Sequence, residues 1–138
     1  MRIVLDTNVL VSGLLRAASP PGWIVRRVAE GEISLCHDDR ILAEYRDVLA
    51  RDRFGFDLAS VTALIEQIVH WGHETAPQPL PLPLPDPDDE AFLEIALASD
   101  ASCLVTGNQK HFPPELRQGV QVLTPAEFID FYQQAQAL

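Results

Sequence analysis

Short apolar runs alternate along this chain with longer stretches in which apolar residues recur every three or four positions. The runs are too short for helices and rich in β-branched residues, whereas the longer stretches have the period of amphipathic helices. Strands joined by helices run parallel and are covered on both faces, so this alternation predicts an α/β fold with a mostly parallel central sheet. The predicted strands are residues 3–5, 33–36, 73–76, 103–105 and 120–122, and the predicted helices are 9–16, 23–30, 39–49, 57–71, 87–99 and one that begins at 125.

Two proline-containing segments interrupt this pattern. Residues 19–22, Ser-Pro-Pro-Gly, predict a break between the first two helices. Residues 77–87 contain six prolines, which favours an extended loop or an edge strand. A linker between two domains is the alternative, but the 51 residues after it (88–138) could hardly form an independent core. We therefore expect a single domain over residues 1–138.

Composition narrows the class of protein. Cys36 and Cys103 lie in apolar runs and the chain begins without the pattern of a signal peptide, so we expect a cytoplasmic protein with reduced thiols. No apolar segment approaches the roughly 18 to 20 residues that cross a bilayer, which excludes a membrane partner. The formal charge of −10 argues against binding nucleic acid by general attraction, although carboxylates gathered to hold cations contribute to the same imbalance.

Polar side chains follow two of the predicted strands directly. Asp6 comes after strand 3–5, and Thr106-Gly107-Asn108 comes after strand 103–105. Ligands of parallel α/β sheets bind at the carboxyl ends of the strands, so both groups should open on the same edge. The alternative is structural: Asp6 would cap the next helix, and Asn108 would form a turn beside Gly107.

Helical geometry separates two acidic residues of the helix over residues 39–49. At about 100° per residue, Glu44 lies at the border of the apolar face, whereas Asp47 points almost opposite to the core. Glu44 could therefore reach a cleft, and Asp47 is a solvated charge. A solvated or salt-bridged Glu44 is the alternative interpretation.

The acidic segment 86–90 opens the next helix, with Asp86 as cap and Pro87 at the first helical position. Capping does not explain Asp89, which lies three, four and seven residues before Phe92, Leu93 and Ala96, on the face that should meet the sheet. A carboxylate at such a position needs a partner, which a metal ion, an arginine or backbone donors could supply.

Taken together, these pieces resemble the PIN domain family, as found in toxin components of prokaryotic toxin-antitoxin pairs. The resemblance implies a three-layer fold with about five strands, in which Asp6, Glu44 and Asp89 are the acidic residues of a metal site and Asn108 stands where many relatives have a fourth aspartate. The matching segments are 5–8 (Leu-Asp-Thr-Asn), 41–45 (Ile-Leu-Ala-Glu-Tyr), 86–89 with Phe92, Leu93 and Ala96, and 105–108 (Val-Thr-Gly-Asn) with Lys110, His111 and Phe112.

The resemblance also implies an activity. It indicates an endoribonuclease that hydrolyses RNA phosphodiester bonds with Mg²⁺ or Mn²⁺, a cognate antitoxin as partner, and a homodimer. In this interpretation Asp6 and Asp89 bind the metal and Glu44 holds or deprotonates the attacking water. Thr7, Asn8 and Thr106 could fix the orientation of ligands and phosphate. Asp86 or Asp88 could supply the charge that Asn108 lacks.

Asn108 keeps a second interpretation open, because an amide withdraws one negative charge from the metal site. The chain could be a catalytically weak PIN-like domain that serves as a binding or regulatory module. A phosphatase of the haloacid-dehalogenase type also begins with an aspartate after its first strand, but its second aspartate would fall at Asn8. The four histidines lack the spacing of a zinc helix.

Overall fold

A parallel five-stranded sheet forms the centre of the computed structural model, which describes residues 1–137. The strand order is β3-β2-β1-β4-β5, and every pair of neighbours is parallel. The sheet confirms the prediction of an α/β fold with a mostly parallel central sheet. The strands are β1 Arg2–Leu5, β2 Ser34–His37, β3 His73–Glu74, β4 Leu104–Val105 and β5 Val122–Leu123.

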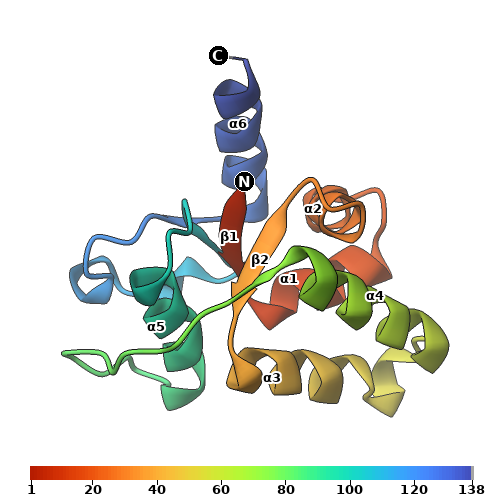
Figure 1. The fold of residues 1–138 in the computed structure, drawn as a ribbon, viewed down its shortest axis with the longest axis horizontal. Coiled ribbons are helices and arrows are strands. Elements are labelled where there is room, and N and C mark those ends of the chain that lie inside the picture. The colour runs from red at the N-terminus through yellow and green to blue at the C-terminus, as the bar shows by residue number, and fades with distance from the viewer. Residues whose placement is uncertain (138) are drawn as a thin grey trace.

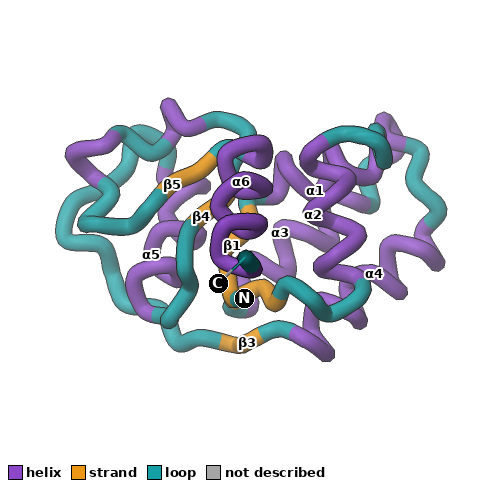
Figure 2. The backbone as a smooth tube through the Cα atoms, turned by 90° about the horizontal axis from the view of Figure 1, so that it is seen from above, coloured by secondary structure: helices purple, strands orange, loops and turns teal. Residues whose placement is uncertain are grey.

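Helices cover the sheet on both faces (Figures 1 and 2). In both views α5 lies on one side of β1, and α1, α2, α3 and α4 lie together on the other. The last helix, α6, extends beyond the amino end of β1 and contacts α2 and β5. The helices are α1 Thr7–Leu15, α2 Pro20–Ala29, α3 Asp39–Leu49, α4 Leu58–Trp71, α5 Glu90–Ala98 and α6 Pro125–Gln136.

Two predicted boundaries are wrong for identifiable reasons. The predicted break at residues 19–22 is the start of α2, because the Ser19 hydroxyl accepts a hydrogen bond from Gly22 N and Pro20 occupies the first helical position. The predicted helix over 87–99 begins with a 3-10 turn, η2 Pro87–Asp89, which Asp86 caps by accepting from Asp88 N. Residues 77–86 form a loop and not an edge strand.

The core fixes the geometry of the carboxyl edge. Ile3, Val4 and Leu5 of β1 are fully buried. The hydroxyl of Tyr45, buried on α3, donates a hydrogen bond of 2.5 Å to the Leu5 carbonyl. This bond ties α3 to β1 at the residue before Asp6.

Among residues 1–137, no helix combines the length and apolar character that a membrane crossing requires.

Candidate active site at the carboxyl edge of the sheet

Asp6 is buried directly after β1, at the point where the chain enters α1. Its Oδ2 accepts a hydrogen bond of 2.8 Å from the Thr106 hydroxyl, and its backbone N–H donates to Val105 O at 2.9 Å. Within the described chain its carboxylate makes no side-chain capping hydrogen bond to α1, although the backbone N–H groups of Thr7 and Asn8 are near enough to lower its pKa. Burial raises the pKa of Asp6, and the Thr106 hydrogen bond lowers it in part.

The ends of β1 and β4 are joined by further polar contacts. Thr106 is fully buried, and its hydroxyl oxygen also accepts from Asn108 N at 3.0 Å. Asn8 Oδ1 accepts from Gly107 N at 3.1 Å. These bonds hold the two strand ends in a fixed relation, as expected from adjacent parallel strands.

Glu44 lies half-buried on α3 and turns towards β1. Its Oε2 accepts a hydrogen bond from the Thr7 hydroxyl. Burial raises the pKa of Glu44, and the nearby negative charges of Asp6 and Asp88 raise it further. Asp47, on the same helix, is exposed and pairs with Arg51, as its helical phase indicates.

Asp89 ends the η2 turn and is buried against the sheet. Its Oδ2 accepts no hydrogen bond within residues 1–137, and the imidazole Nδ1 of His111 lies 3.4 Å from it. Burial, followed by the charge of Asp6, raises the pKa of Asp89 to about 6, although His111 opposes the shift. Burial and the neighbouring charge of Asp6 therefore both disfavour the ionised form of Asp89.

One cavity of about 430 Å³ brings these groups together. We call it the carboxylate cavity. Of the predicted residues, it is lined by Asp6, Thr7, Asn8, Glu44 and Asp89.

Other predicted residues lie outside this cavity. Among the residues that the structure describes, Asn108 does not line it, and its Nδ2 lies 3.0 Å from Nε2 of His111. Thr106 reaches the cavity only through Asp6. Asp86 is exposed and caps the η2 turn, whereas Asp88 lines a neighbouring cavity.

The carboxylate cavity also contains three residues that the sequence did not single out, together with His111, which belongs to a matching segment but not to the predicted metal site. Arg51, Arg53 and Phe54 come from the segment between α3 and α4, and His111 comes from the turn after β4. A usable signal was present in the first three, because two arginines and an aromatic residue directly follow the helix that carries Glu44.

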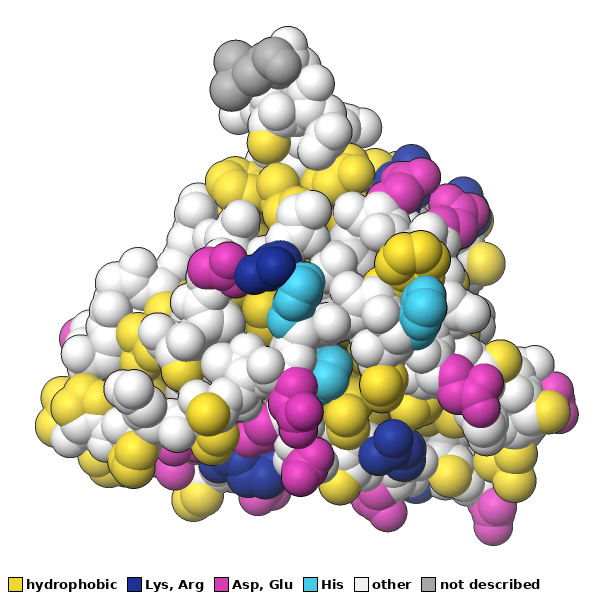
Figure 3. Space-filling model, viewed as in Figure 1, with side chains coloured by type: hydrophobic (Ala, Val, Ile, Leu, Met, Phe, Trp, Pro, Cys, Tyr) yellow, Lys and Arg dark blue, Asp and Glu magenta, His cyan; other side chains and the backbone are white. Residues whose placement is uncertain are grey.

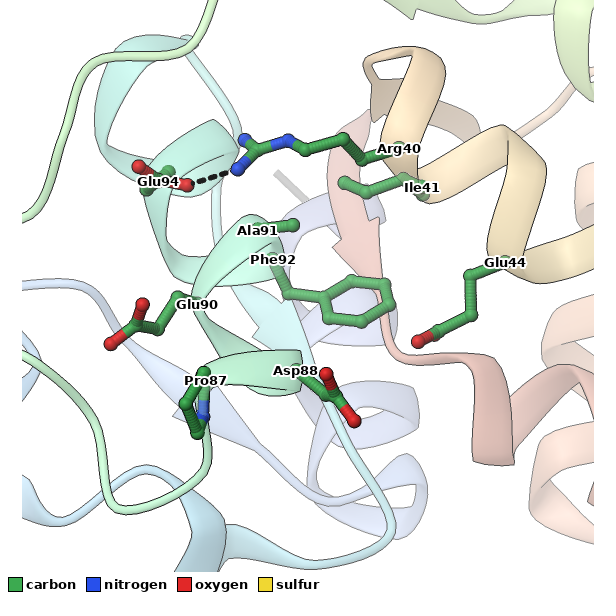
Figure 4. A pocket seen from close by; sticks show the side chains of 9 residues that line it. All are labelled: Arg40, Ile41, Glu44, Pro87, Asp88, Glu90, Ala91, Phe92 and Glu94. Atoms are coloured by element: carbon green, nitrogen blue, oxygen red, sulfur yellow. Dashed lines mark hydrogen bonds and ion pairs between the residues drawn. The ribbon is translucent and has the colours of Figure 1, made fainter.

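A second cavity of about 310 Å³ adjoins the first and shares Glu44 with it (Figure 4). We call it the side cavity; Arg40, Asp88, Glu90 and Glu94 are among its lining residues. Figure 4 shows Arg40 joined to Glu94, with Nη1 to Oε2 at 2.6 Å. Nε of Arg40 also donates to Asp38 Oδ2 at 2.7 Å.

The donor set of the carboxylate cavity suits a divalent cation. Three carboxylates line it, one of their oxygens is buried without a hydrogen bond, and the Asp6 charge raises the pKa of the other two. A hard cation would relieve this repulsion and supply the missing partner. Across residues 1–137, however, no three His, Cys, Asp or Glu side chains are already gathered around a point where an ion could sit, so binding would require side-chain adjustment.

Comparison with known proteins gives one match. The model of the family described as PIN domain matches residues 2–110. The matched region contains the three carboxylates and ends one residue before His111. No curated protein matches the sequence.

Proposed function

The chain belongs to the PIN domain family, whose members are generally nucleases that use divalent metal ions, and we propose that this protein is a metal-dependent endoribonuclease. The observation that carries the proposal is the convergence of Asp6, Glu44 and Asp89 on one cavity. They come from three segments far apart in the sequence, and packing of apolar residues alone would not select buried, mutually repelling acids.

Asp6 and Asp89 would hold Mg²⁺ or Mn²⁺ directly, and Glu44, the third acid of the metal site, would contact the ion through a water molecule. When bound, such an ion lowers the pKa of a water and neutralises charge on the phosphate. The protein's own groups prepare this chemistry: Thr106 fixes the carboxylate of Asp6, and Thr7 fixes that of Glu44.

Glu44 is the proposed general base. Its raised pKa makes it a better proton acceptor than an ordinary glutamate, while its half-buried position leaves it facing the cavity. Water attacks the phosphorus, its proton passes to Glu44, and the bond from phosphorus to the leaving ribose oxygen breaks. His111 lies beside Asp89 at the cavity wall, with Nδ1 at 3.4 Å from Oδ2 of Asp89.

The test is cleavage of a mixture of RNA oligonucleotides in Mn²⁺, with metal binding measured by calorimetry. We expect roughly micromolar to millimolar Mn²⁺ binding to the wild-type protein. Asp6→Asn and Asp89→Asn should each lower cleavage on the order of 100-fold or more with folding intact. Asp130→Asn, an exposed position on α6, is the matched control and should cleave as the wild type does. Cleavage unchanged in both site variants would refute the proposal.

The departure at position 108 favours a second candidate, a catalytically weak PIN domain that acts as a binding or regulatory module. Asn108 directs its amide towards His111 and adds no charge to the metal site. This candidate predicts that the wild-type protein binds Mn²⁺ poorly and leaves RNA intact. The same calorimetric and cleavage measurements therefore separate the two candidates.

The biological setting is proposed from the family resemblance. We propose that the protein is the toxin of a toxin-antitoxin pair, a homodimer of single domains spanning residues 1–138, located in the cytoplasm and silenced by a cognate antitoxin. Induced expression of the wild type should then arrest growth, whereas Asp6→Asn should not. Sedimentation of the purified protein measures its oligomeric state.

A further inference from the structure

The segment between α3 and α4 places two arginines on the wall of the carboxylate cavity. It begins at the end of α3, forms the η1 turn Asp52–Phe54, and reverses at Gly55, whose φ of +65° lies in the left-handed region. Asp57 then caps α4 by accepting from Ser60 N. Arg51 directly precedes the turn and Arg53 lies within it, and both line the carboxylate cavity.

Arg53 is held by aromatic rings. Its guanidinium carbon lies 4.7 Å from the centre of the Phe54 ring, and that ring stacks on Phe56 at 5.6 Å with an interplanar angle of 14°. No carboxylate within the described residues pairs with Arg53. The stack restricts the orientation of the guanidinium, while its N–H donors remain available for a ligand.

Arg51 differs from Arg53 in having a partner, since its Nη2 lies 3.2 Å from Asp47 Oδ2. The side chains of Arg51 and Asp47 are largely exposed, at 47% and 75% respectively. Exposed pairs of this kind contribute little and exchange readily for another anion. Arg51 can therefore turn to an incoming phosphate at small cost.

A polyanionic substrate of this cavity needs such groups. The chain carries a formal charge of −10, and the basic side chains on the face in Figure 3 are scattered singly between acidic and apolar ones. Attraction by a broad basic surface is therefore absent from that face. Within residues 1–137, Arg51 and Arg53 are the arginine or lysine side chains on the cavity wall.

We propose that Arg53, supported by Arg51, binds an RNA backbone phosphate next to the scissile one and so positions the strand across the three carboxylates. This inference rests on the proposed nuclease function. Arginine suits the task because its planar fork donates two hydrogen bonds to one phosphate. The two arginines lie directly beyond the helix that carries Glu44, so a strand held there passes the proposed base.

The experiment compares Arg53→Ala and Arg53→Lys with Arg46→Ala. Arg46 is exposed on the last turn of α3 and lies outside the carboxylate cavity. Arg46→Ala therefore removes the same charge from a nearby position as a control. Binding of a fluorescein-labelled RNA dodecamer of mixed sequence is followed by anisotropy in Mg²⁺, at several KCl concentrations, in an Asp6→Asn background. Cleavage of the same dodecamer is followed in the native background.

We expect Arg53→Ala to weaken binding about fivefold to tenfold and to reduce the slope of log K against log salt by roughly 0.7, the loss of one phosphate contact on a single strand. KM should rise while kcat stays within about twofold. Arg53→Lys should keep the salt slope and recover part of the affinity, and Arg46→Ala should match its parent.

The outcomes separate this inference from the nuclease proposal. If the wild type cuts RNA but Arg53→Ala binds and cuts as Arg46→Ala does, phosphate binding by Arg53 is wrong, whereas the proposed nuclease function is unaffected. If the Asp6→Asn parent does not bind the dodecamer and the wild type does not cut it, both proposals fall. A loss of RNA affinity in Arg53→Ala could also accompany a lowered Tm. If Arg53→Lys does not restore the affinity, Arg53 has a structural role, and phosphate binding by Arg53 is again wrong.

Discussion

The carboxylate cavity and the side cavity share Glu44 and are both acidic, yet their charges are arranged differently. In the side cavity, Arg40 pairs with Glu94 and with Asp38. Glu90 accepts a hydrogen bond of 2.9 Å from Leu84 N. In the carboxylate cavity, Asp89 keeps a buried oxygen without a hydrogen bond, and its pKa rises to about 6.

This contrast shows that the number of acidic residues does not define a candidate metal site. Carboxylates that already have arginine or backbone partners stabilise the fold and have little to gain from a cation. Carboxylates that repel one another in a buried cavity gain most from one.

The largest expected effect lies at the residue that both cavities share. Glu44→Gln keeps the shape of the side chain and an acceptor for the Thr7 hydroxyl but removes the proposed base. We expect cleavage to fall about 100-fold, the scale of general-base catalysis. Asp88→Asn, an exposed acid of the side cavity, should change cleavage less than about threefold. Equal losses in the two variants would show that the cavities act as one site.

Asn108→Asp tests whether the departure from the family pattern limits metal binding. The added carboxylate would lie beside His111, which contacts Asp89, and should attract a cation to the carboxylate cavity. We expect Mn²⁺ affinity to rise about threefold to tenfold, measured by calorimetry. Asp130→Asn again serves as the unaffected control. Unchanged affinity would mean that position 108 lies too far from the ion to matter.

The sequence predicts the positions of those site residues that depend only on strand order and helical phase. Asp6 and Thr106 follow strands that turned out to be parallel neighbours, so their meeting is a consequence of strand order. Glu44 was placed by helical phase. Asp89 was predicted to face the sheet as part of a helix, and it faces inward from the η2 turn instead.

The rest depends on the paths of loops, which no period in the sequence encodes. Arg53 and Phe54 reach the cavity because the η1 turn and Gly55 bend the chain back beside α3. The amide of Asn108 lies near His111 because Asn108 directly precedes the short 3-10 turn Gln109–His111. Such contacts are set by tertiary packing and not by local propensity.

Arg40→Ala tests whether the arginine-paired acids beside the side cavity stabilise the fold. The substitution leaves Asp38 and Glu94 without their arginine partner, and the side chains of both acids are only 8% and 12% exposed. We expect the free energy of unfolding to fall by about 1–2 kcal/mol, because Arg40 itself is half exposed and water replaces part of the pairing. Urea denaturation measures the loss, and kcat should stay within about twofold. A large loss of kcat would place the side cavity in the active site.

The smallest expected effect concerns the stability of the metal-free protein. Because the pKa of Asp89 rises from 3.8 to about 6 on folding, its ionised form opposes folding. The penalty is absent below pH 4, grows between pH 4 and 6, and is constant above. Asp89→Asn should therefore be more stable than the wild type at pH 7 in EDTA by about 1 kcal/mol, after allowance for the open cavity, and the difference should vanish towards pH 4.

Urea denaturation at a series of pH values measures this difference, and Asp130→Asn controls for the loss of a surface charge. Asp89→Asn, which lowers cleavage, is thus expected to stabilise the metal-free fold. The reason is that a buried carboxylate without its cation destabilises the folded state. A less stable Asp89→Asn at pH 7 would contradict this reasoning. It would mean that the contact with His111 outweighs the cost of burial, and that Asp89 resembles the paired acids of the side cavity.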